Sequence, residues 1–287
     1  MSSNNQSDAI GYLQYRLNLL TDQIEQTKIL AAQPMVRELR RLEDAIPLCQ
    51  SEFRVFSQFG DDGIIQYSIN RLHLPIAERR FIEFGVENYY EANTRFLLLN
   101  DNWSGLIMDG SDAYISDVRR ESLYWRHDLT ALARFIRREN INPILEEAGF
   151  SGRIGILSID VDGNDYWIWE ALTAVDPAIV IVEYNGIFGS HEAVTIPYQP
   201  DFARQNAHYS YLYWEPLFRR SLILPPEKVM SGLGAIAREI TPILCGASTL
   251  TISTCQGCRK TSSRPSSGKD VTRKASWLTS AKKKDLN

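Results

Sequence analysis

Acidic side chains lie at the end of, or just after, five short apolar runs in the middle of the chain. The runs are 81–86, 106–108, 131–136, 154–159 and 179–182. A carboxylate can accept hydrogen bonds from ligand hydroxyls, bind a divalent cation, or take up a proton as a general base. Each residue could instead cap the helix after its run, but recurrence at all five runs indicates a shared site. The acidic residues are Glu83, Glu87, Asp109, Glu139, Asp160, Asp162 and Glu183.

Asp109 and Gly85 have the spacing of an adenosine-binding site. Asp109 lies 24 residues after Gly85, and a carboxylate at the end of a second strand can accept both hydroxyls of a ribose. Gly85 lets the backbone come close to the ligand. The surrounding run FGVENYYEANT (84–94) contains one glycine and lacks the G-x-G-x-x-G pattern that holds a diphosphate at a helix N-terminus. A cofactor without phosphate is therefore expected rather than NAD or FAD.

The segment LSIDVDGND (157–165) concentrates acidic residues and leaves two interpretations open. As a calcium-binding loop it fails, because Asp165 stands where that loop requires glycine. In a sugar-nucleotide site, Asp160 and Asp162 could share one divalent cation. At the end of a strand, Asp160 would point into a pocket while Asp162 or Asn164 caps the helix that follows. The strand-end interpretation is favoured.

The elements that must position these side chains are strands alternating with helices. The apolar runs have strand length, and stretches of helical length separate them at 91–100, 112–122, 139–148 and 164–174. This alternation predicts a doubly wound, mostly parallel sheet, and the continuous apolar runs indicate strands buried on both faces. In such sheets ligands bind beyond the carboxyl ends of the strands. The predicted fold class is therefore α/β, with a Rossmann-like core that brings the acidic residues to one edge.

A helical arm is predicted to precede this core. Apolar residues from Leu13 to Ala31 recur at steps of three and four, so residues 10–33 should form a helix that packs on the domain or on a second subunit. Pro34 is expected to end or kink this helix. A further helix is predicted to begin behind Gly60, where acidic residues precede a new apolar pattern.

Composition indicates a globular protein without a membrane segment. The chain has 287 residues, 44% of them hydrophobic, and no apolar run approaches the roughly 18 residues of a membrane span. The N-terminus lacks the features of a signal peptide, so a cytoplasmic location is expected. Cys255 and Cys258 form a CxxC pair without the further ligands of a zinc site. Residues 259–287 carry nine Lys and Arg against two Asp, but without periodicity this tail does not predict nucleic-acid binding.

Seven short segments occur in a recognisable order along the chain. They are SQFGDDGI (57–64), FIEFGVE (81–87), GLIMDGS (105–111), ENIN (139–142), LSIDVDGNDYWIWEAL (157–172), IVEYN (181–185) and TIPY (195–198). With these segments the chain resembles the FkbM-type methyltransferases over about residues 57–213. These are class I S-adenosylmethionine-dependent enzymes, and many are associated with O-methylation of glycans or secondary metabolites.

The resemblance implies S-adenosyl-L-methionine as the cofactor and assigns expected positions to five residues. Glu83 and Gly85 would lie at the methionine end of the cofactor, and Asp109 at its ribose. Glu139 or Asn140 would lie near the adenine. The loop after the first strand holds fewer glycines than the family pattern.

The resemblance further implies a methyl acceptor with a hydroxyl group, either a glycan or another small molecule. Asp160 would lie near the transferred methyl group, and Asp160 or His191 could take the proton of the hydroxyl. Two other functions stay open. One is a metal-dependent glycosyltransferase that uses Asp160 and Asp162, and the other is a non-enzymatic, cofactor-binding remnant.

Beyond Trp214 the chain changes character. All 13 tyrosines precede Trp214, three of the four cysteines follow it, and no segment of 215–287 alternates like the closing antiparallel hairpin of a class I methyltransferase. Plausible codons for Glu227 to Cys245, read from the third base of each codon, encode KGYEWFGCNSAGNYAYFV. This peptide has two β-rich halves around a turn. The hypothesis is therefore a slip of the reading frame near Tyr213.

These observations divide the chain into a helical arm at 1–50, a core at 51–213 and an out-of-frame tail at 214–287. The tail is predicted to have little packed structure. Without the closing hairpin, one edge of the sheet would keep unpaired backbone groups and uncovered apolar surface. A product of low stability or low activity is therefore expected.

Overall fold

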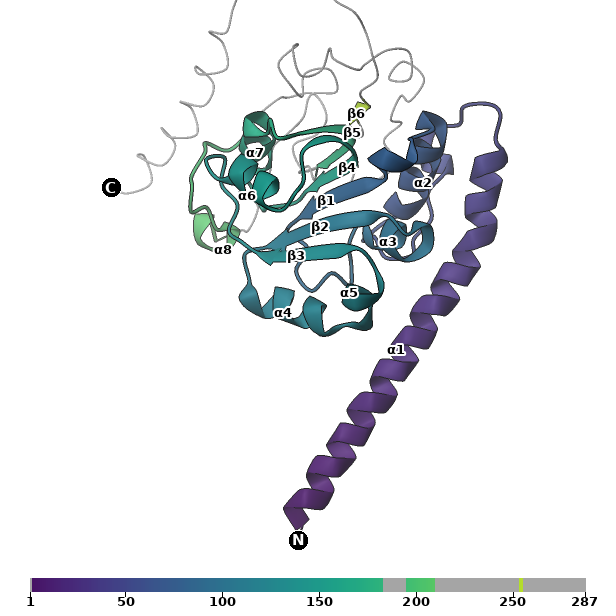
Figure 1. Ribbon diagram of the computed structural model, residues 1–287, viewed down its shortest axis with the longest axis vertical. Helices are drawn as coiled ribbons and strands as arrows, with labels where there is room; N and C mark the ends of the chain where they lie inside the picture. The colour runs from purple at the N-terminus through teal and green to yellow at the C-terminus, as the bar shows by residue number, and fades with distance from the viewer. Residues whose placement is uncertain (1, 183–194, 210–252, 255–287) are drawn as a thin grey trace, which may run out of the picture.

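The computed structural model describes residues 2–182, 195–209 and 253–254 (Figure 1). Its centre is a sheet with the strand order β3-β2-β1-β4-β5-β6. The first five strands are parallel, and β6 is antiparallel to β5. The strands are β1 (Arg80–Phe84), β2 (Ser104–Asp109), β3 (Leu129–Ala133), β4 (Gly152–Ile159), β5 (Val175–Val182) and β6 (Ser253–Thr254).

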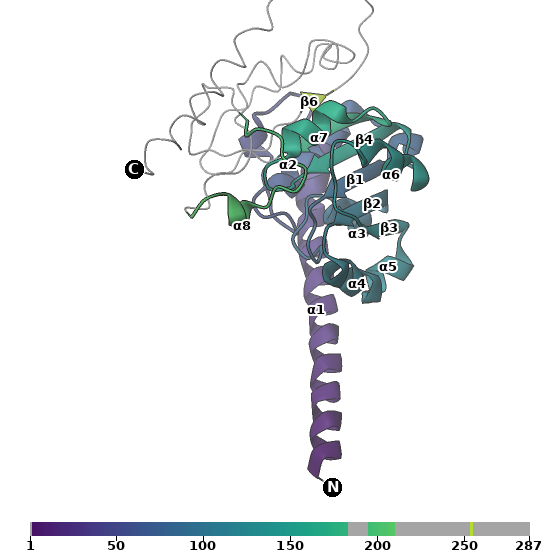
Figure 2. The same ribbon diagram turned by 90° about the vertical axis from the view of Figure 1, so that its left-hand side faces the viewer.

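Helices cover both faces of this sheet (Figures 1 and 2). Side chains of α2 to α5 pack on one face and those of α6 and α7 on the other. The helices are α1 (Ser2–Arg41), α2 (Asp61–Leu72), α3 (Arg95–Asp101), α4 (Asp112–Arg120), α5 (Ser122–Arg126), α6 (Ile141–Glu147), α7 (Asp165–Ala171) and α8 (Arg204–Ala207), with 3₁₀ turns at Leu48–Gln50 and Ile76–Glu78.

The strand order reverses between β1 and β4. From β1 the chain proceeds outward through β2 to β3, and it then returns to the other side of β1 to form β4 and β5. In a doubly wound sheet, such a reversal opens a crevice beyond the carboxyl ends of the two central strands. The loops after Phe84 and Ile159 therefore flank the place where a ligand is expected.

The predicted α/β class is confirmed, and all five apolar runs form strands. Their burial on both faces explains the continuous apolar sequence; Phe81, Leu106 and Leu157, for example, are fully buried. The boundaries differ at β3, which ends at Ala133 rather than at Ile136. As a result the last three residues of that run belong to the loop at the carboxyl edge.

Helix α1 continues through Pro34 to Arg41, so the prediction of a helix end at Pro34 is wrong. A proline inside a helix removes one N–H donor and strains the preceding turn. Packing offsets this cost, because Ala32, Val36 and Leu39 on both sides of the proline are buried against the domain. The N-terminal half of α1 projects beyond the domain (Figures 1 and 2).

A buried arginine ties α1 to the core. Arg95 at the start of α3 is 1% exposed and binds Glu25 of α1 at 2.8 Å and Glu121 at 3.3 Å. Its guanidinium also donates to the carbonyl of Tyr89 at 3.0 Å. The predicted packing of the arm on the domain is thus confirmed for the part of α1 that follows Glu25.

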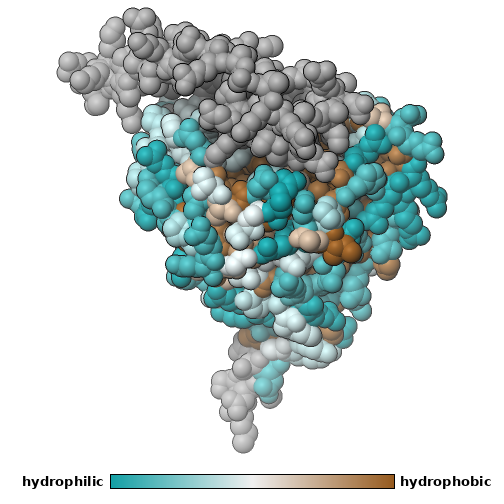
Figure 3. All heavy atoms as spheres, turned by 45° about the horizontal axis from the view of Figure 1, so that its top comes forward, coloured by the Kyte–Doolittle hydropathy of each residue, from teal (hydrophilic) through white to brown (hydrophobic). Residues whose placement is uncertain are grey.

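Within the predicted tail the structure describes Ser253 and Thr254, which pair with Val180 and Ile179 at the outer edge of β5. At these two positions the outer edge of β5 is paired, contrary to the open edge that was expected. The predictions for the rest of the tail concern residues outside the described part. No described helix is long and apolar enough to cross a membrane. On the side shown in Figure 3, the described surface is mostly hydrophilic, with apolar residues in small patches.

Candidate active site

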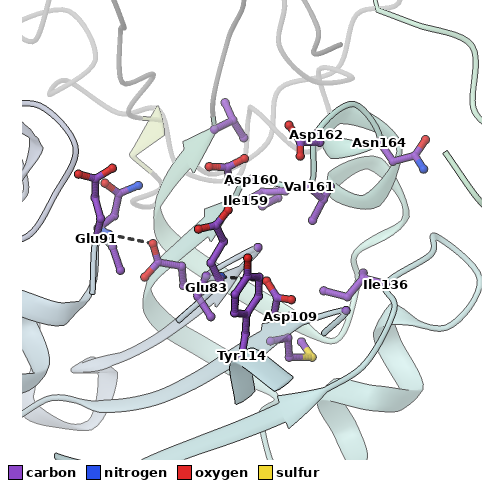
Figure 4. A pocket seen from close by; sticks show the side chains of 18 of the residues that line it. Glu83, Glu91, Asp109, Tyr114, Ile136, Ile159, Asp160, Val161, Asp162 and Asn164 are labelled. Carbon is purple, nitrogen blue, oxygen red and sulfur yellow. Dashed lines mark hydrogen bonds between the residues drawn. The ribbon is translucent and has the colours of Figure 1, made fainter. Parts of the chain in front are cut away.

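A cavity of about 750 Å³ lies at the carboxyl edge of the sheet (Figure 4). All five parallel strands contribute to it through their last residues or the loops that follow them. The start of α2 and residues 202–204 complete the wall. This size is typical of sites for small molecules and cofactors. The predicted location of a site at this edge is therefore matched by a cavity of suitable size.

Gly85 and Asp160 join the two central strand ends at the wall of the cavity. Gly85 has a φ of +72°, a backbone conformation that residues with a side chain rarely adopt. A Cβ atom at this position would lie 1.5 Å from the carbonyl oxygen of Asp160. The close approach that the sequence predicted for Gly85 is thus an approach to the backbone of the neighbouring strand end.

Glu83, near the end of β1, is 5% exposed and holds the loop that follows β1. One carboxylate oxygen accepts from the backbone N–H of Asn93 at 2.9 Å. The other accepts from the backbone N–H of Thr94 at 3.1 Å and from the Thr94 hydroxyl. Burial raises the pKa of the Glu83 carboxyl. Glu83 reaches the cavity wall as expected, but its main contacts are with this loop.

Asp109, the last residue of β2, bridges two loops at the cavity. One carboxylate oxygen accepts from the backbone N–H of Glu87 at 2.9 Å, and the other accepts from the N–H of Ser111 at 2.7 Å. Ser111 caps α4 by accepting from the N–H of Tyr114 at 3.3 Å. Each carboxylate oxygen keeps a second lone pair for a further donor. This is the position and the capacity that ribose binding requires.

The structure does not bring Glu139 and Asn140 to the cavity. Glu139 is exposed and accepts from the hydroxyl of Tyr198, a hydrogen bond that holds the pKa of the Glu139 carboxyl below its usual range. Asn140 binds the backbone of Arg137 and Phe135 at 2.7 and 3.0 Å and so shapes the turn before α6. The cavity is lined there by residues 134–136 instead. Because β3 ends early, the polar residues expected near the ligand lie several residues too far along the chain.

The loop after β4 places Asp160 in the cavity wall and ties Asp162 to Arg204. Figure 4 shows Asp160 among the labelled lining residues, above Asp109. Asp162, with a φ of +55°, pairs with Arg204 at 3.1 Å. Asp165 accepts from the N–H groups of Val161 at 3.1 Å and Gly163 at 2.9 Å and closes the turn.

Asn164 occupies the N-cap position of α7, as one of the two predicted alternatives had it, but its side chain makes no cap hydrogen bond. The Asn164 amide instead donates to the carbonyl of Gln199 at 2.8 Å. This contact joins α7 to the segment around Gln199, close to residues 202–204 of the cavity wall. Asn164 itself also lines the cavity.

Several predicted site residues lie outside the described part of the chain. His191, the second candidate base, is one of them, and so are the polar residues that follow β5, beginning with Glu183. At β5 the cavity is lined by Ile181 and Val182.

Asp61 is a candidate functional residue that the sequence reading missed. It stands in the first turn of α2 and lines the cavity. Burial, together with the negative charges of Asp62 and Glu52, raises the pKa of the Asp61 carboxyl to about 6. A carboxyl with such a pKa can exchange a proton near neutral pH. The signal in the sequence was the Asp61–Asp62 pair, interpreted only as a helix start.

Asp62 fixes the position of its neighbour. It is 1% exposed, and one of its oxygens accepts from the backbone N–H groups of Val55, Phe56 and Ser57 at 2.7 to 2.8 Å. This bundle of charge-assisted hydrogen bonds holds the segment before α2. Burial raises the pKa of the Asp62 carboxyl, and these hydrogen bonds oppose the shift. Asp62 therefore has a structural role, and it positions the neighbouring Asp61 at the cavity.

The lining of the cavity is strongly acidic. In the part of the lining that the structure describes, seven carboxylates face two arginines, and one of these arginines, Arg204, is paired with Asp162. No group of three or more His, Cys, Asp or Glu side chains in the described ranges has the arrangement of a metal site. The acidic residues are Asp61, Glu83, Glu87, Glu91, Asp109, Asp160 and Asp162, and the second arginine is Arg134.

No family model and no curated protein matches the chain. Similar solved structures include the CurJ carbon methyltransferase at 15% identity and a TM-score of 0.33, covering 47% of this chain and 37% of that chain. The O-methyltransferase from Bacillus cereus in complex with SAH shows 11% identity, 57% and 69% coverage and a TM-score of 0.34. The N-terminal domain of EvdMO1 with SAH bound shows 14% identity, 56% and 69% coverage and a TM-score of 0.29. At these scores, the fold class rests on the strand order and helix layers themselves.

Proposed function

We propose that this chain is an S-adenosylmethionine-dependent methyltransferase that methylates a hydroxyl group of a glycan or another small molecule. The observation that carries the proposal is the acidic cavity around Asp109, at the switch point of a doubly wound sheet. S-Adenosylmethionine has a ribose for a strand-end carboxylate, a positive sulfonium and ammonium group, and no phosphate. When bound, it supplies an electrophilic methyl group.

Charge distinguishes this cofactor from the alternatives. A carboxylate about 5 Å from a phosphate charge costs about 3 kcal/mol at an effective dielectric constant of 20. Among its described lining residues the cavity has five more carboxylates than arginines, so this part of the wall disfavours the diphosphate of a dinucleotide or a sugar nucleotide. The same field attracts a sulfonium ion. For the glycosyltransferase alternative, the Asp162–Arg204 pair is unfavourable, because the positive charge of Arg204, 3.1 Å from Asp162, would repel a cation bound there.

The described residues fit the cofactor in three places. The second lone pairs of Asp109 suit the ribose hydroxyls. Residues 134–136 lie in the wall beside Asp109. The apolar side chains of Phe135 and Ile136 suit the adenine, in place of Glu139 and Asn140. The loop held by Glu83 suits the methionine end, because its residues Glu87 and Glu91 line the cavity and would attract the ammonium group.

Two described carboxylates are candidates for the proton acceptor. Asp160 lies at the carboxyl end of β4, where the resemblance places the transferred methyl group. Asp61 has the pKa best suited to a general base near neutral pH. Either would accept the proton that the acceptor hydroxyl loses on methylation. His191, outside the described residues, stays a third candidate.

The proposed frame slip bears on activity rather than on the site. The described residues that line the cavity run no further than Arg204, and all of these lie before Tyr213. We therefore expect this chain to bind the cofactor and the frame-restored chain to be the better catalyst. Sequencing of the coding DNA tests the slip directly. A single unambiguous frame through 215–287, shared by close relatives, would remove it.

A ligand panel tests the proposed function. Calorimetric titration should show binding of S-adenosylmethionine and S-adenosylhomocysteine at micromolar concentrations, and none of NAD or of a uridine diphosphate sugar with Mn²⁺. Binding of the sugar nucleotide without S-adenosylmethionine would favour the glycosyltransferase. If the cofactor binds but neither this chain nor the frame-restored chain transfers a methyl group to any acceptor hydroxyl, the chain is the cofactor-binding remnant.

A further inference from the structure

The N-terminal half of α1 carries a stripe of exposed apolar side chains, here called the α1 stripe. Its five members recur at alternating steps of three and four residues, and their exposed fractions are 52%, 65%, 63%, 49% and 60% in chain order. A continuous row of exposed leucine and isoleucine on one helix marks an interaction surface. No described element packs on this row. Its residues are Ile10, Leu13, Leu17, Leu20 and Ile24.

The α1 stripe is not the face that α1 turns toward its own domain. That face carries Glu25, which binds Arg95, and Ile29, Ala32 and Val36, which pack on the core. At 3.6 residues per turn, the two faces are about 100° apart around the helix axis. The stripe can therefore be covered by another body while α1 stays docked on the domain.

The spacing of the stripe specifies the shape of its partner. Steps of three and four residues average 3.5, and a row with this period stays in contact with another helix when the two wrap around each other left-handed. In heptad terms, Ile10, Leu17 and Ile24 occupy a positions, and Leu13 and Leu20 occupy d positions. Isoleucine at two of the three a positions, with leucine at both d positions, favours two strands.

We propose that the α1 stripe pairs with the same stripe of a second copy of this chain in a two-stranded coiled coil. The partner must offer an apolar helical row of matching length. Among the described helices, α1 has 40 residues and the next longest, α2, has 12. A two-fold axis along the stripe places identical apolar rows opposite each other, so one sequence supplies both halves of the interface.

The positions that flank the stripe are compatible with this pairing. In a parallel pair, a g residue of one helix faces the e residue of the next heptad in the other. Arg16 at g would then face Thr21, and Gln23 at g would face Lys28. No like charges meet. Because the domain lies about 100° from the stripe, the two domains would sit on opposite sides of the coiled coil.

The length of the stripe sets the expected strength of the dimer. From Ile10 to Ile24 the helix rises about 21 Å, and an interface of this length buries on the order of 1,000 Å² in total. Specific protein interfaces begin near this size. We therefore expect a dimer that dissociates at micromolar concentrations rather than a permanent one.

Sedimentation velocity on the full chain, from about 1 to 100 µM, tests the proposal. The wild-type chain should shift from monomer to dimer over this range. The double variant Leu17→Glu/Leu20→Glu should stay monomeric at 100 µM, since it puts charges into the seam, the line along which the two α1 stripes would meet. The matched control Tyr15→Glu/Leu19→Glu changes exposed residues outside the seam, 60% and 40% exposed in the wild type, and should dimerise like the wild type.

Two results would overturn the proposal. One is a wild-type chain that stays monomeric at every concentration. The other is a seam variant that dimerises as well as the control. Circular dichroism melting of both variants checks that the domain is intact, and the concentration series on the wild type stands even if a variant fails to fold.

Discussion

The carbonyl oxygen of Asp160 fills the space beside Gly85 that a Cβ atom would require, at 1.5 Å from where that atom would lie. This contact joins the loops after β1 and β4 at the switch point of the sheet. It positions the proposed cofactor loop and a candidate proton acceptor by the same backbone approach. The geometry of the site therefore depends on a glycine at position 85.

Gly85→Ala should destabilise the protein by more than about 3 kcal/mol and abolish cofactor binding, because it adds a backbone clash to the cost of a positive φ. Gly149→Ala is the matched control. Its φ is +76°, but nothing lies within 4 Å of the added Cβ, so it should cost only about 1–2 kcal/mol. Urea unfolding measures both. Equal losses of unfolding free energy in the two variants would show that the backbone at Asp160 moves aside at little cost.

Removing the buried arginine of α3 should loosen α1. In Arg95→Met, Glu25 and Glu121 lose their shared partner within a largely buried site, and loss of one member of a buried ion pair costs about 3–5 kcal/mol. The control Arg54→Met breaks the pair with Glu91, whose side chains are 61% and 49% exposed. It should cost less than about 1 kcal/mol. Thermal unfolding compares the two, and similar losses would contradict a special role for Arg95.

Asp61 should make the stability depend on pH. The pKa of its carboxyl is about 6 in the folded protein, against 3.8 without the fold. The native state therefore binds more protons between these values, and the stability that the protonated group contributes is present below pH 3.8 and lost as the pH rises through about 6. Asp61→Asn should stabilise the protein by about 1–3 kcal/mol at pH 8 and by almost nothing at pH 4.

The same variant tests the chemistry. If Asp61 is the general base, the rate of methyl transfer by a catalytically active chain should rise through pH 6, and Asp61→Asn should remove that inflection. If Asp160 is the base, Asp61→Asn should keep most of the rate at pH 8. Asp160→Asn would then lower the rate by about 100-fold or more, with little change in cofactor affinity.

The fold could be predicted from the sequence because buried parallel strands appear in it as continuous apolar runs. Runs such as 154–159 have no polar position within them apart from Ser158, which is itself buried. The length of α1 was less accessible. Its continuation past Pro34 depends on tertiary burial of Val36 and Leu39, which local sequence rules do not contain.

The site residues could be predicted from the sequence where they lie at the end of a strand, and not elsewhere. Gly85, Asp109 and Asp160 follow directly from the ends of β1, β2 and β4 and line the cavity. Glu139 was wrongly expected at the cavity, because the predicted end of β3 came three residues later than the observed end. Asp61 was missed because it comes from a helix before the sheet, and only the three-dimensional packing brings it to the strand ends.

The proposed site for S-adenosylmethionine is centred on Asp109, and calorimetric titration of the wild-type chain and of the variant Asp109→Ala tests it. Wild-type protein should bind S-adenosylmethionine, and Asp109→Ala, which also leaves the N–H groups of Glu87 and Ser111 without their acceptor, should bind it about 10- to 100-fold more weakly. Asp112→Ala, an exposed carboxylate just beyond the cavity, should bind like the wild type. Absence of binding to the wild-type chain, or equal affinity in Asp109→Ala, would rule out a cofactor site centred on Asp109.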